Sequence, residues 1–129
     1  MKHVLIADDM PTILEQAEEI IGDRYKVTAV ASAEEMLKAA ENEKPDVILM
    51  DMYLDQTDST ELLRELKENE NTKNIPVIMT ATDASVMEIS RYYKAGACDF
   101  MKKPFVENIL YRRIEVAFAL KEAGLYELI

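Results

Sequence analysis

Apolar residues occur along the chain in short runs that alternate with stretches of helical spacing. The runs predict five strands, in sequence order Val4–Ala7, Tyr25–Val30, Asp46–Met50, Pro76–Thr80 and Ala97–Met101. The first, third and fourth are almost continuously apolar, as strands covered on both faces are. The second and fifth contain polar residues, which edge strands tolerate better. We therefore expect three central strands and two edge strands.

The stretches between the strands have apolar residues three and four positions apart, which is typical of helices with one buried face. Ser32 followed by Glu35 predicts a capping box at the start of one helix. Gly96 stands where the predicted helix Ala84–Lys94 needs a left-handed residue to end.

Two apolar lines run along the last predicted helix. The line that we expect to be buried contains Val106, Ile109, Val116 and Leu120. The second line, part of which could be a docking surface, contains Leu110, Ile114 and Phe118.

Regular alternation of strands and helices implies an open parallel sheet with right-handed crossovers and helices on both faces. With the first, third and fourth strands at the centre, the strand order is 2-1-3-4-5. That order defines the flavodoxin-like, doubly wound (βα)5 fold of the α/β class. Such sheets bind ligands outside the carboxyl ends of the strands where the winding reverses, which here is between the first and third strands.

Length and composition favour one globular domain. The chain has 129 residues, of which 49% are hydrophobic and 31% charged. We place the domain at residues 1–121 and a tail at 122–129. Neither a membrane span nor a signal-peptide cleavage site is evident, so we expect a cytoplasmic location. The single cysteine, Cys98, cannot form an internal disulfide, and we expect it to be buried and structural.

Charge argues against direct binding to nucleic acid. The formal net charge is −10 at pH 7, and basic residues adjoin one another only as pairs, Lys102-Lys103 and Arg112-Arg113. A surface of this sign repels the phosphates of DNA and RNA.

Polar residues stand at the carboxyl ends of four predicted strands: Asp8 and Asp9, Asp51, Thr80, and Lys103. In the predicted topology they converge on one rim. Carboxylates brought together raise one another's pKa unless a cation is present, and Lys103 and Mg²⁺ are the candidates. Mg²⁺ prefers oxygen ligands and commonly takes one or two carboxylates plus a phosphate, whereas no cluster of His and Cys indicates zinc.

Each residue also has an ordinary alternative. Asp9, ahead of Pro11, could cap a helix, as could Thr80 with Asp83, and Lys103 could be a solvated lysine. We favour a joint site because these residue types rarely coincide at successive strand ends by chance.

From Lys2 to about Lys121 the sequence resembles the receiver domains of bacterial response regulators, which are the phosphorylation switches of two-component signalling. The segments that carry the resemblance are Val4–Asp9, Asp46–Asp51, Pro76–Ala81 and Gly96–Phe105. The resemblance implies a domain that accepts a phosphoryl group with Mg²⁺ as cofactor. Such a domain catalyses only its own phosphorylation and dephosphorylation.

The resemblance also implies a metal site of four residues. Asp51 would be the phosphoacceptor and a ligand, and Asp9 a direct ligand. Asp8 would act through water, and Tyr53 would lend its backbone carbonyl.

Three further roles follow from the same resemblance. Thr80 would be the switch hydroxyl that bonds the phosphoryl oxygens, and Phe100 the switch aromatic that turns inward when Thr80 moves. Lys103 would be the family's lysine, which acts with Asp51 in catalysis because its charge balances that of the phosphoryl oxygens.

The partners implied are a sensor histidine kinase or a histidine phosphotransfer protein upstream, and an output protein or domain downstream. Nothing after Lys121 could form an output domain, so the chain is either a stand-alone regulator or part of a longer one. Phosphorylation would reshape the face of the fourth helix, fifth strand and fifth helix, where a homodimer could form. Side chains that could pair across it are Arg91, Tyr92, Asp99, Arg112 and Arg113.

The segment after Asp51 departs from the family pattern. Asp55 stands in place of the usual proline and Ser59 in place of the usual glycine. We expect an altered loop and an added negative charge near the site. Tyr53, two residues after the acceptor, is expected to slow hydrolysis of the phosphoryl group.

Three other functions fit less well. A haloacid-dehalogenase-type phosphatase needs a second acid where Tyr53 stands. A flavodoxin needs a phosphate loop rich in glycine and hydroxyls where Asp8 and Asp9 stand. A degenerate receiver that serves only as an interaction scaffold would not need the complete set of acids, hydroxyl and lysine.

Overall fold

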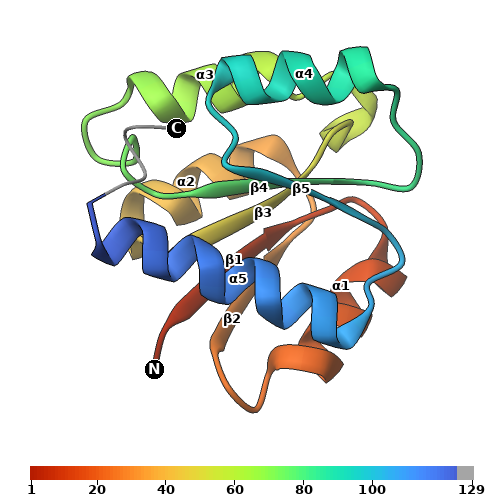
Figure 1. The fold of residues 1–129 in the computed structure, drawn as a ribbon, viewed down its shortest axis with the longest axis vertical. Coiled ribbons are helices and arrows are strands. Elements are labelled where there is room, and N and C mark those ends of the chain that lie inside the picture. Colours follow the sequence, from red (N-terminus) through yellow and green to blue (C-terminus); the bar gives the residue numbers. More distant parts are fainter. Residues whose placement is uncertain (125–129) are drawn as a thin grey trace.

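The computed structural model describes residues 1–124, which form a five-stranded sheet between two layers of helices (Figure 1). All neighbouring strands are parallel, and the order β2-β1-β3-β4-β5 confirms the predicted α/β doubly wound fold. The elements in chain order are β1 (His3–Ala7), α1 (Pro11–Ile21), β2 (Lys26–Val30), α2 (Ala33–Glu43), β3 (Val47–Asp51), the 3-10 turn η1 (Leu54–Gln56), α3 (Thr60–Glu68), β4 (Val77–Ala81), α4 (Val86–Ala95), β5 (Asp99–Lys102) and α5 (Glu107–Glu122).

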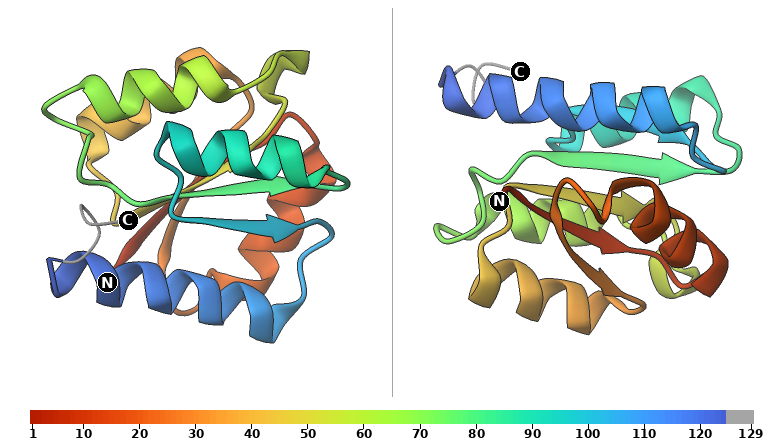
Figure 2. Two further views of the ribbon diagram at one scale, coloured as in Figure 1. Left: turned by 45° about the horizontal axis from the view of Figure 1, so that its top comes forward. Right: turned by 90° about the horizontal axis from the view of Figure 1, so that it is seen from below.

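Two cores lie on opposite faces of the sheet, because side chains alternate between the faces along each strand. In β1, Leu5 and Ala7 pack with α2, α3 and α4, whereas Val4 and Ile6 pack with α1 and α5. Figure 2 shows α5 and α2 on opposite sides of the sheet. Strands covered on both faces have no solvent-facing positions, which explains why β1, β3 and β4 are buried throughout.

The helix ends follow the expected capping chemistry in part. Ser32 caps α2 by accepting the Glu35 N–H, and Gly96 ends α4 with a φ of 117°. A complete capping box occurs at α4, where Ser85 and Glu88 bond each other's backbone N–H.

The capping alternatives considered for the strand-end residues are wrong. Met10 occupies the N-cap position of α1 and makes no capping hydrogen bond with its side chain, and the residue that caps α4 is Ser85. Asp9, Thr80 and Asp83 therefore do not owe their positions to these caps.

The predicted orientation of α5 is wrong. Its buried residues are Leu110, Ile114, Ala117 and Phe118. Val106, Ile109 and Val116 are 53%, 41% and 46% exposed, and Leu120 is half-buried. Both lines have helical spacing, and the buried line includes Ala117, which is small enough to approach the sheet closely.

Cys98 precedes β5 and is half-buried rather than fully buried. Burial raises the pKa of its thiol to about 12, so the reactive thiolate is disfavoured at neutral pH, as a structural cysteine requires.

At the carboxyl end, α5 continues to Glu122, which pairs with Lys2. The rest of the predicted tail, from residue 125, lies outside the described residues. Within residues 1–124, no helix has the length and apolarity that crossing a membrane requires.

Candidate functional site

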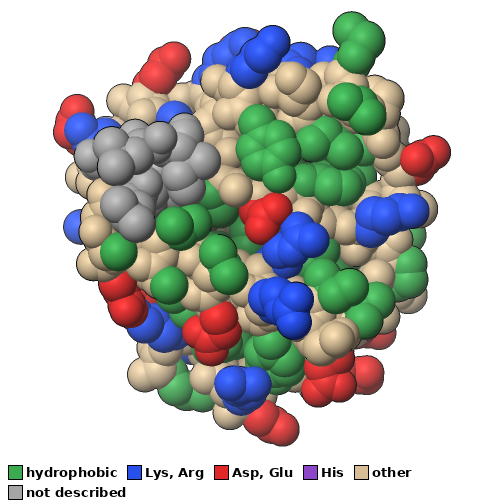
Figure 3. Space-filling view, viewed as in Figure 1, with side chains coloured by type: hydrophobic (Ala, Val, Ile, Leu, Met, Phe, Trp, Pro, Cys, Tyr) green, Lys and Arg blue, Asp and Glu red, His purple; other side chains and the backbone are tan. Residues whose placement is uncertain are grey.

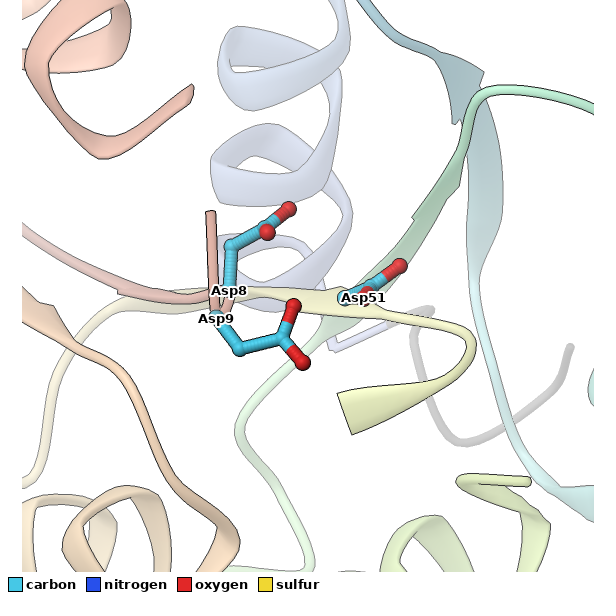
Figure 4. Close-up of side chains that lie close together, drawn as sticks. All are labelled: Asp8, Asp9 and Asp51. Atoms are coloured by element: carbon cyan, nitrogen blue, oxygen red, sulfur yellow. The ribbon is translucent and has the colours of Figure 1, made fainter. Parts of the chain in front are cut away.

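Three carboxylates meet where β1 and β3 end. Asp8 and Asp9 follow β1, Asp51 is the last residue of β3, and one carboxylate oxygen of each lies within 4.8 Å of the others (Figure 4). These strands are neighbours although α1, β2 and α2 separate them in sequence, because the winding of the sheet reverses between them. Asp8 and Asp51 are buried, whereas Asp9 faces solvent.

Lys103 reaches the carboxylates from the end of β5, although the Lys103–Pro104 segment is three strands away from β1. Its Nζ donates to Asp8 Oδ2 at 2.7 Å and to Asp51 Oδ1 at 3.2 Å. The side chain is only 4% exposed, which excludes the alternative of a solvated lysine.

Burial and charge shift the pKa values of this ion pair. Burial raises the pKa of the Asp51 carboxyl, and the nearby charge of Asp8 adds to the rise, while Lys103 opposes it. For Lys103 burial lowers the pKa, but the hydrogen bond to Asp8 and the charge of Asp51 outweigh burial and leave the pKa raised. Lys103 is therefore a fixed positive charge.

The donor set suits Mg²⁺. All of the candidate side-chain ligands are carboxylate oxygens, and three ionised carboxylates beside one ammonium group leave two negative charges unbalanced. A divalent cation would balance that charge. The solvent-facing carboxylate of Asp9 lies on the open side of the cluster, where a cation that keeps some of its water could enter. Tyr53 lies next to the site, since its backbone N–H bonds to the Asp51 carboxylate.

Thr80 lies beside the acceptor, whereas Phe100 lies outside the cluster. In the sheet register Asp51 pairs with Thr80, and the Thr80 carbonyl accepts the Met52 N–H at 2.9 Å. Phe100 belongs to β5 and packs, half-buried, against the core that contains α4. The structure thus places a buried hydroxyl next to Asp51 and an aromatic ring one strand farther away.

The two unusual residues in the loop after Asp51 make specific contacts. Ser59 is buried, and its Oγ donates to the Asp51 carbonyl at 2.8 Å and accepts the Leu54 N–H at 3.2 Å. Asp55 has a left-handed φ of 57°, and its carboxylate accepts the Ala33 N–H at 2.8 Å at the start of α2. The negative charge of Asp55 therefore stabilises the α2 N-terminus instead of adding to the acidic cluster.

Four of the five residues expected to pair across a dimer are engaged within the chain. Tyr92 is the buried residue of α4, Arg91 pairs with Asp58, and Arg113 bonds to Asp99 at 3.0 Å. Arg112 remains exposed. These contacts could not be predicted from the sequence because they join residues in different elements of the fold.

The face of α4, β5 and α5 nonetheless has the character of a binding surface. Figure 3 views this side and shows Lys and Arg side chains among hydrophobic ones, despite the net charge of −10. A groove here is lined by Phe100, Met101, Lys102, Pro104, Val106, Ile109 and Arg113.

Comparison with known proteins gives a consistent result. The family model described as response regulator receiver domain matches residues 4–115. Protein PilH of Pseudomonas aeruginosa is 31% identical over 92% of this chain and 99% of its own length. The alkaline phosphatase synthesis transcriptional regulatory protein PhoP of Bacillus subtilis is 30% identical over 94% of this chain, which spans only 50% of PhoP. The chain thus spans half or less of several of the longer relatives it matches.

Solved structures of receiver domains also match. A CheY-like receiver domain protein from Methanospirillum hungatei has a TM-score of 0.87 and 29% identity, over 96% of this chain and 98% of its own. The receiver domain of the sensor histidine kinase PA1611 from Pseudomonas aeruginosa, solved with a magnesium ion in its active site cleft, has a TM-score of 0.82 and 28% identity over 92% and 98%. This chain belongs to the family of response regulator receiver domains.

Proposed function

We propose that this receiver domain is a phosphorylation switch in which Asp51 accepts a phosphoryl group from a histidine kinase or a histidine phosphotransfer protein. The observation that carries the proposal is the cluster of Asp8, Asp9 and Asp51 with Lys103 bonded to two of its members. A scaffold would have no need for this buried group of charges, because taking an ammonium group and carboxylates out of water is costly even when they are paired.

In the proposed reaction a carboxylate oxygen of Asp51 forms a bond to phosphorus while the bond from phosphorus to the donor's imidazole nitrogen breaks. The product is an aspartyl phosphate, and the nitrogen keeps the bonding electron pair. Transfer of this kind depends mainly on alignment and on balancing charge at the phosphoryl oxygens. Lys103 is positioned for the second task, since its Nζ is 3.2 Å from Asp51 Oδ1.

Mg²⁺ would be held by Asp9 and Asp51, by Asp8 through water, and by the carbonyl of Tyr53, and it would balance charge on the transferring group. Asp8 has a second task, because its Oδ2 holds Lys103 in place at 2.7 Å and its Oδ1 accepts the Met10 N–H. Burial of Asp8 and Asp51 keeps bulk water away from the acceptor.

The response to phosphorylation would start at Thr80, which is buried beside Asp51 in the register of β3 and β4. Movement of its hydroxyl toward the phosphoryl group would give Phe100 room to turn inward. The output partner, and a homodimer if one forms, would bind the face of α4, β5 and α5, where the groove beside Phe100 would change shape.

The test is intact mass after incubation with acetyl phosphate. We expect one phosphoryl adduct on the wild type that requires Mg²⁺ and is absent from Asp51→Asn. Asp55→Asn is the matched control, because Asp55 lies in the same loop but its carboxylate faces α2. A wild type that gains no adduct and does not bind beryllofluoride would instead support a degenerate receiver that acts as a scaffold.

A further inference from the structure

Tyr92 is the buried residue of α4, and its hydroxyl ends in the loop that follows the acceptor. The hydroxyl donates to the Met52 carbonyl at 2.7 Å. It also accepts, at 3.2 Å, a share of the Ser59 N–H, which donates to the same Met52 carbonyl at 2.9 Å. Asp58 Oδ1 lies 3.1 Å from the hydroxyl and is a second acceptor for its proton. A tyrosine in a purely apolar role would not need this arrangement of partners.

The two residues that Tyr92 contacts, Met52 and Ser59, are both directly connected to Asp51. Met52 follows Asp51 directly, and its N–H bonds to the Thr80 carbonyl. Ser59 reaches the Asp51 carbonyl through its Oγ at 2.8 Å. The two ends of the loop, next to the acceptor and at the start of α3, meet through the bond from the Ser59 N–H to the Met52 carbonyl, and the Tyr92 hydroxyl braces this junction from α4.

Two further side chains of α4 contact the same loop. Arg91 pairs with Asp58 and donates from Nε to Thr60 Oγ1 at 3.2 Å. Glu88 accepts a hydrogen bond from the hydroxyl of Tyr53. Because α3 and α4 lie side by side (Figure 1), these contacts attach α4 to the backbone around the acceptor.

We propose that Tyr92 is a positioning residue for the acceptor site and that it couples ligand binding at Asp51 to the position of α4. The coupling passes through the loop backbone and is separate from the route through Thr80 and Phe100. It is reciprocal, so whatever fixes α4 also favours the binding-competent loop. This inference rests on the proposed function of Asp51.

The test compares Tyr92→Phe with Tyr93→Phe. Phenylalanine keeps the buried ring of Tyr92 but removes the hydroxyl, whereas Tyr93, the next residue of α4, has a hydroxyl that bonds to Asp99, away from the loop. In Tyr92→Phe the Ser59 N–H keeps its bond to the Met52 carbonyl but loses the brace from α4, so in the metal-free protein we expect modestly faster amide exchange at Ser59 in this variant only. We also expect its affinities for Mg²⁺ and beryllofluoride, measured by calorimetry, to fall roughly three- to tenfold.

A spectroscopic measurement separates positioning from general stability. In the wild type, beryllofluoride should shift the backbone amide resonances of Val86 to Ala95, and in Tyr92→Phe these shifts should shrink at saturating ligand. Arg91→Gln, a change at a partly exposed position of the same helix, should reduce them in the same direction. It provides a second test if Tyr92→Phe folds poorly.

The outcomes are distinguishable. If both variants bind Mg²⁺ and beryllofluoride as the wild type does and α4 responds fully, the coupling is wrong while the proposed function stands. If the wild type itself binds neither ligand, both the proposed function and the coupling are rejected.

Discussion

Lys103 is the residue on which the charge balance of the site depends. The residue is buried and its ammonium group bonds to Asp8 and Asp51, so replacing Lys103 with methionine leaves two buried carboxylates without their cation. Breaking a buried ion pair from one side typically costs about 3–5 kcal/mol, and we expect Lys103→Met to lower the free energy of unfolding by that amount. Urea denaturation without Mg²⁺ measures it.

Lys102→Met is the control for that prediction, since Lys102 is the exposed neighbour and its loss should change stability by less than about 0.5 kcal/mol. Equal stabilities of the two variants would contradict the ion-pair geometry.

Asp51 should show the opposite effect on stability, because burial raises the pKa of its carboxyl in the folded protein. Between the ordinary carboxyl pKa and this raised value the folded state binds more protons than the unfolded state, so stability falls as pH rises. Asp51→Asn removes the effect. At pH 7 without Mg²⁺ we expect its melting temperature to exceed that of the wild type by roughly 2–5 °C.

The pH dependence provides the check. Below the ordinary pKa of an aspartate both states bind the proton, so the advantage of Asp51→Asn should disappear there. Melting curves at pH 7 and at the lowest pH where the protein stays folded would decide. If Asp51→Asn raises the melting temperature by the same amount at both pH values, the ionised carboxylate is not the source of the difference.

At the scale of elements, the two apolar lines of α5 should differ in how much their residues contribute to stability. Ile114 is fully buried against the sheet, whereas Val116 is 46% exposed. Ile114→Ala should cost about 2–5 kcal/mol of unfolding free energy, because it leaves a cavity, and Val116→Ala well under 1 kcal/mol. Chemical denaturation of both variants measures the difference. A larger cost for Val116→Ala would restore the orientation expected from the sequence.

Most of the element pattern could be predicted because it depends on local signals. The predicted strands agree with the observed strands to within two residues at each end, and Gly96 ends α4 with the left-handed conformation that its type allows. The orientation of α5 could not be predicted in this way. Two apolar lines with the same spacing differ only in how they fit the sheet, and a single sequence does not record that fit.

For the site as well, some features could be predicted from the sequence and others could not. Asp8, Asp51 and Lys103 could be placed together because strand ends in one topology must share a rim. The contacts of Asp55 with α2 and of Tyr92 with the loop could not, since each depends on how a loop backbone packs on a distant helix. Tyr92 was expected on the face of α4, β5 and α5, among the side chains that could pair across a homodimer.

At the scale of the whole molecule, the acidic cluster links metal binding to folding. The three carboxylates come together only in the folded sheet, so Mg²⁺ at this site binds the native state in preference to the unfolded chain. At ten times its dissociation constant the metal should add about 1.4 kcal/mol to the free energy of unfolding. For a domain of this size we expect a rise in melting temperature of roughly 3–6 °C.

Asp9→Asn tests whether this stabilisation comes from the cluster. Asp9 is exposed, so its replacement should not disturb the fold, but it removes a carboxylate from the solvent-facing side where the metal would enter. We therefore expect the shift with Mg²⁺ to be lost in Asp9→Asn and kept in Asp23→Asn, a change at an exposed acid outside the cluster. Melting curves at constant ionic strength separate specific binding from screening of the net charge of −10. Equal shifts in both variants would mean that Mg²⁺ stabilises the molecule by screening alone.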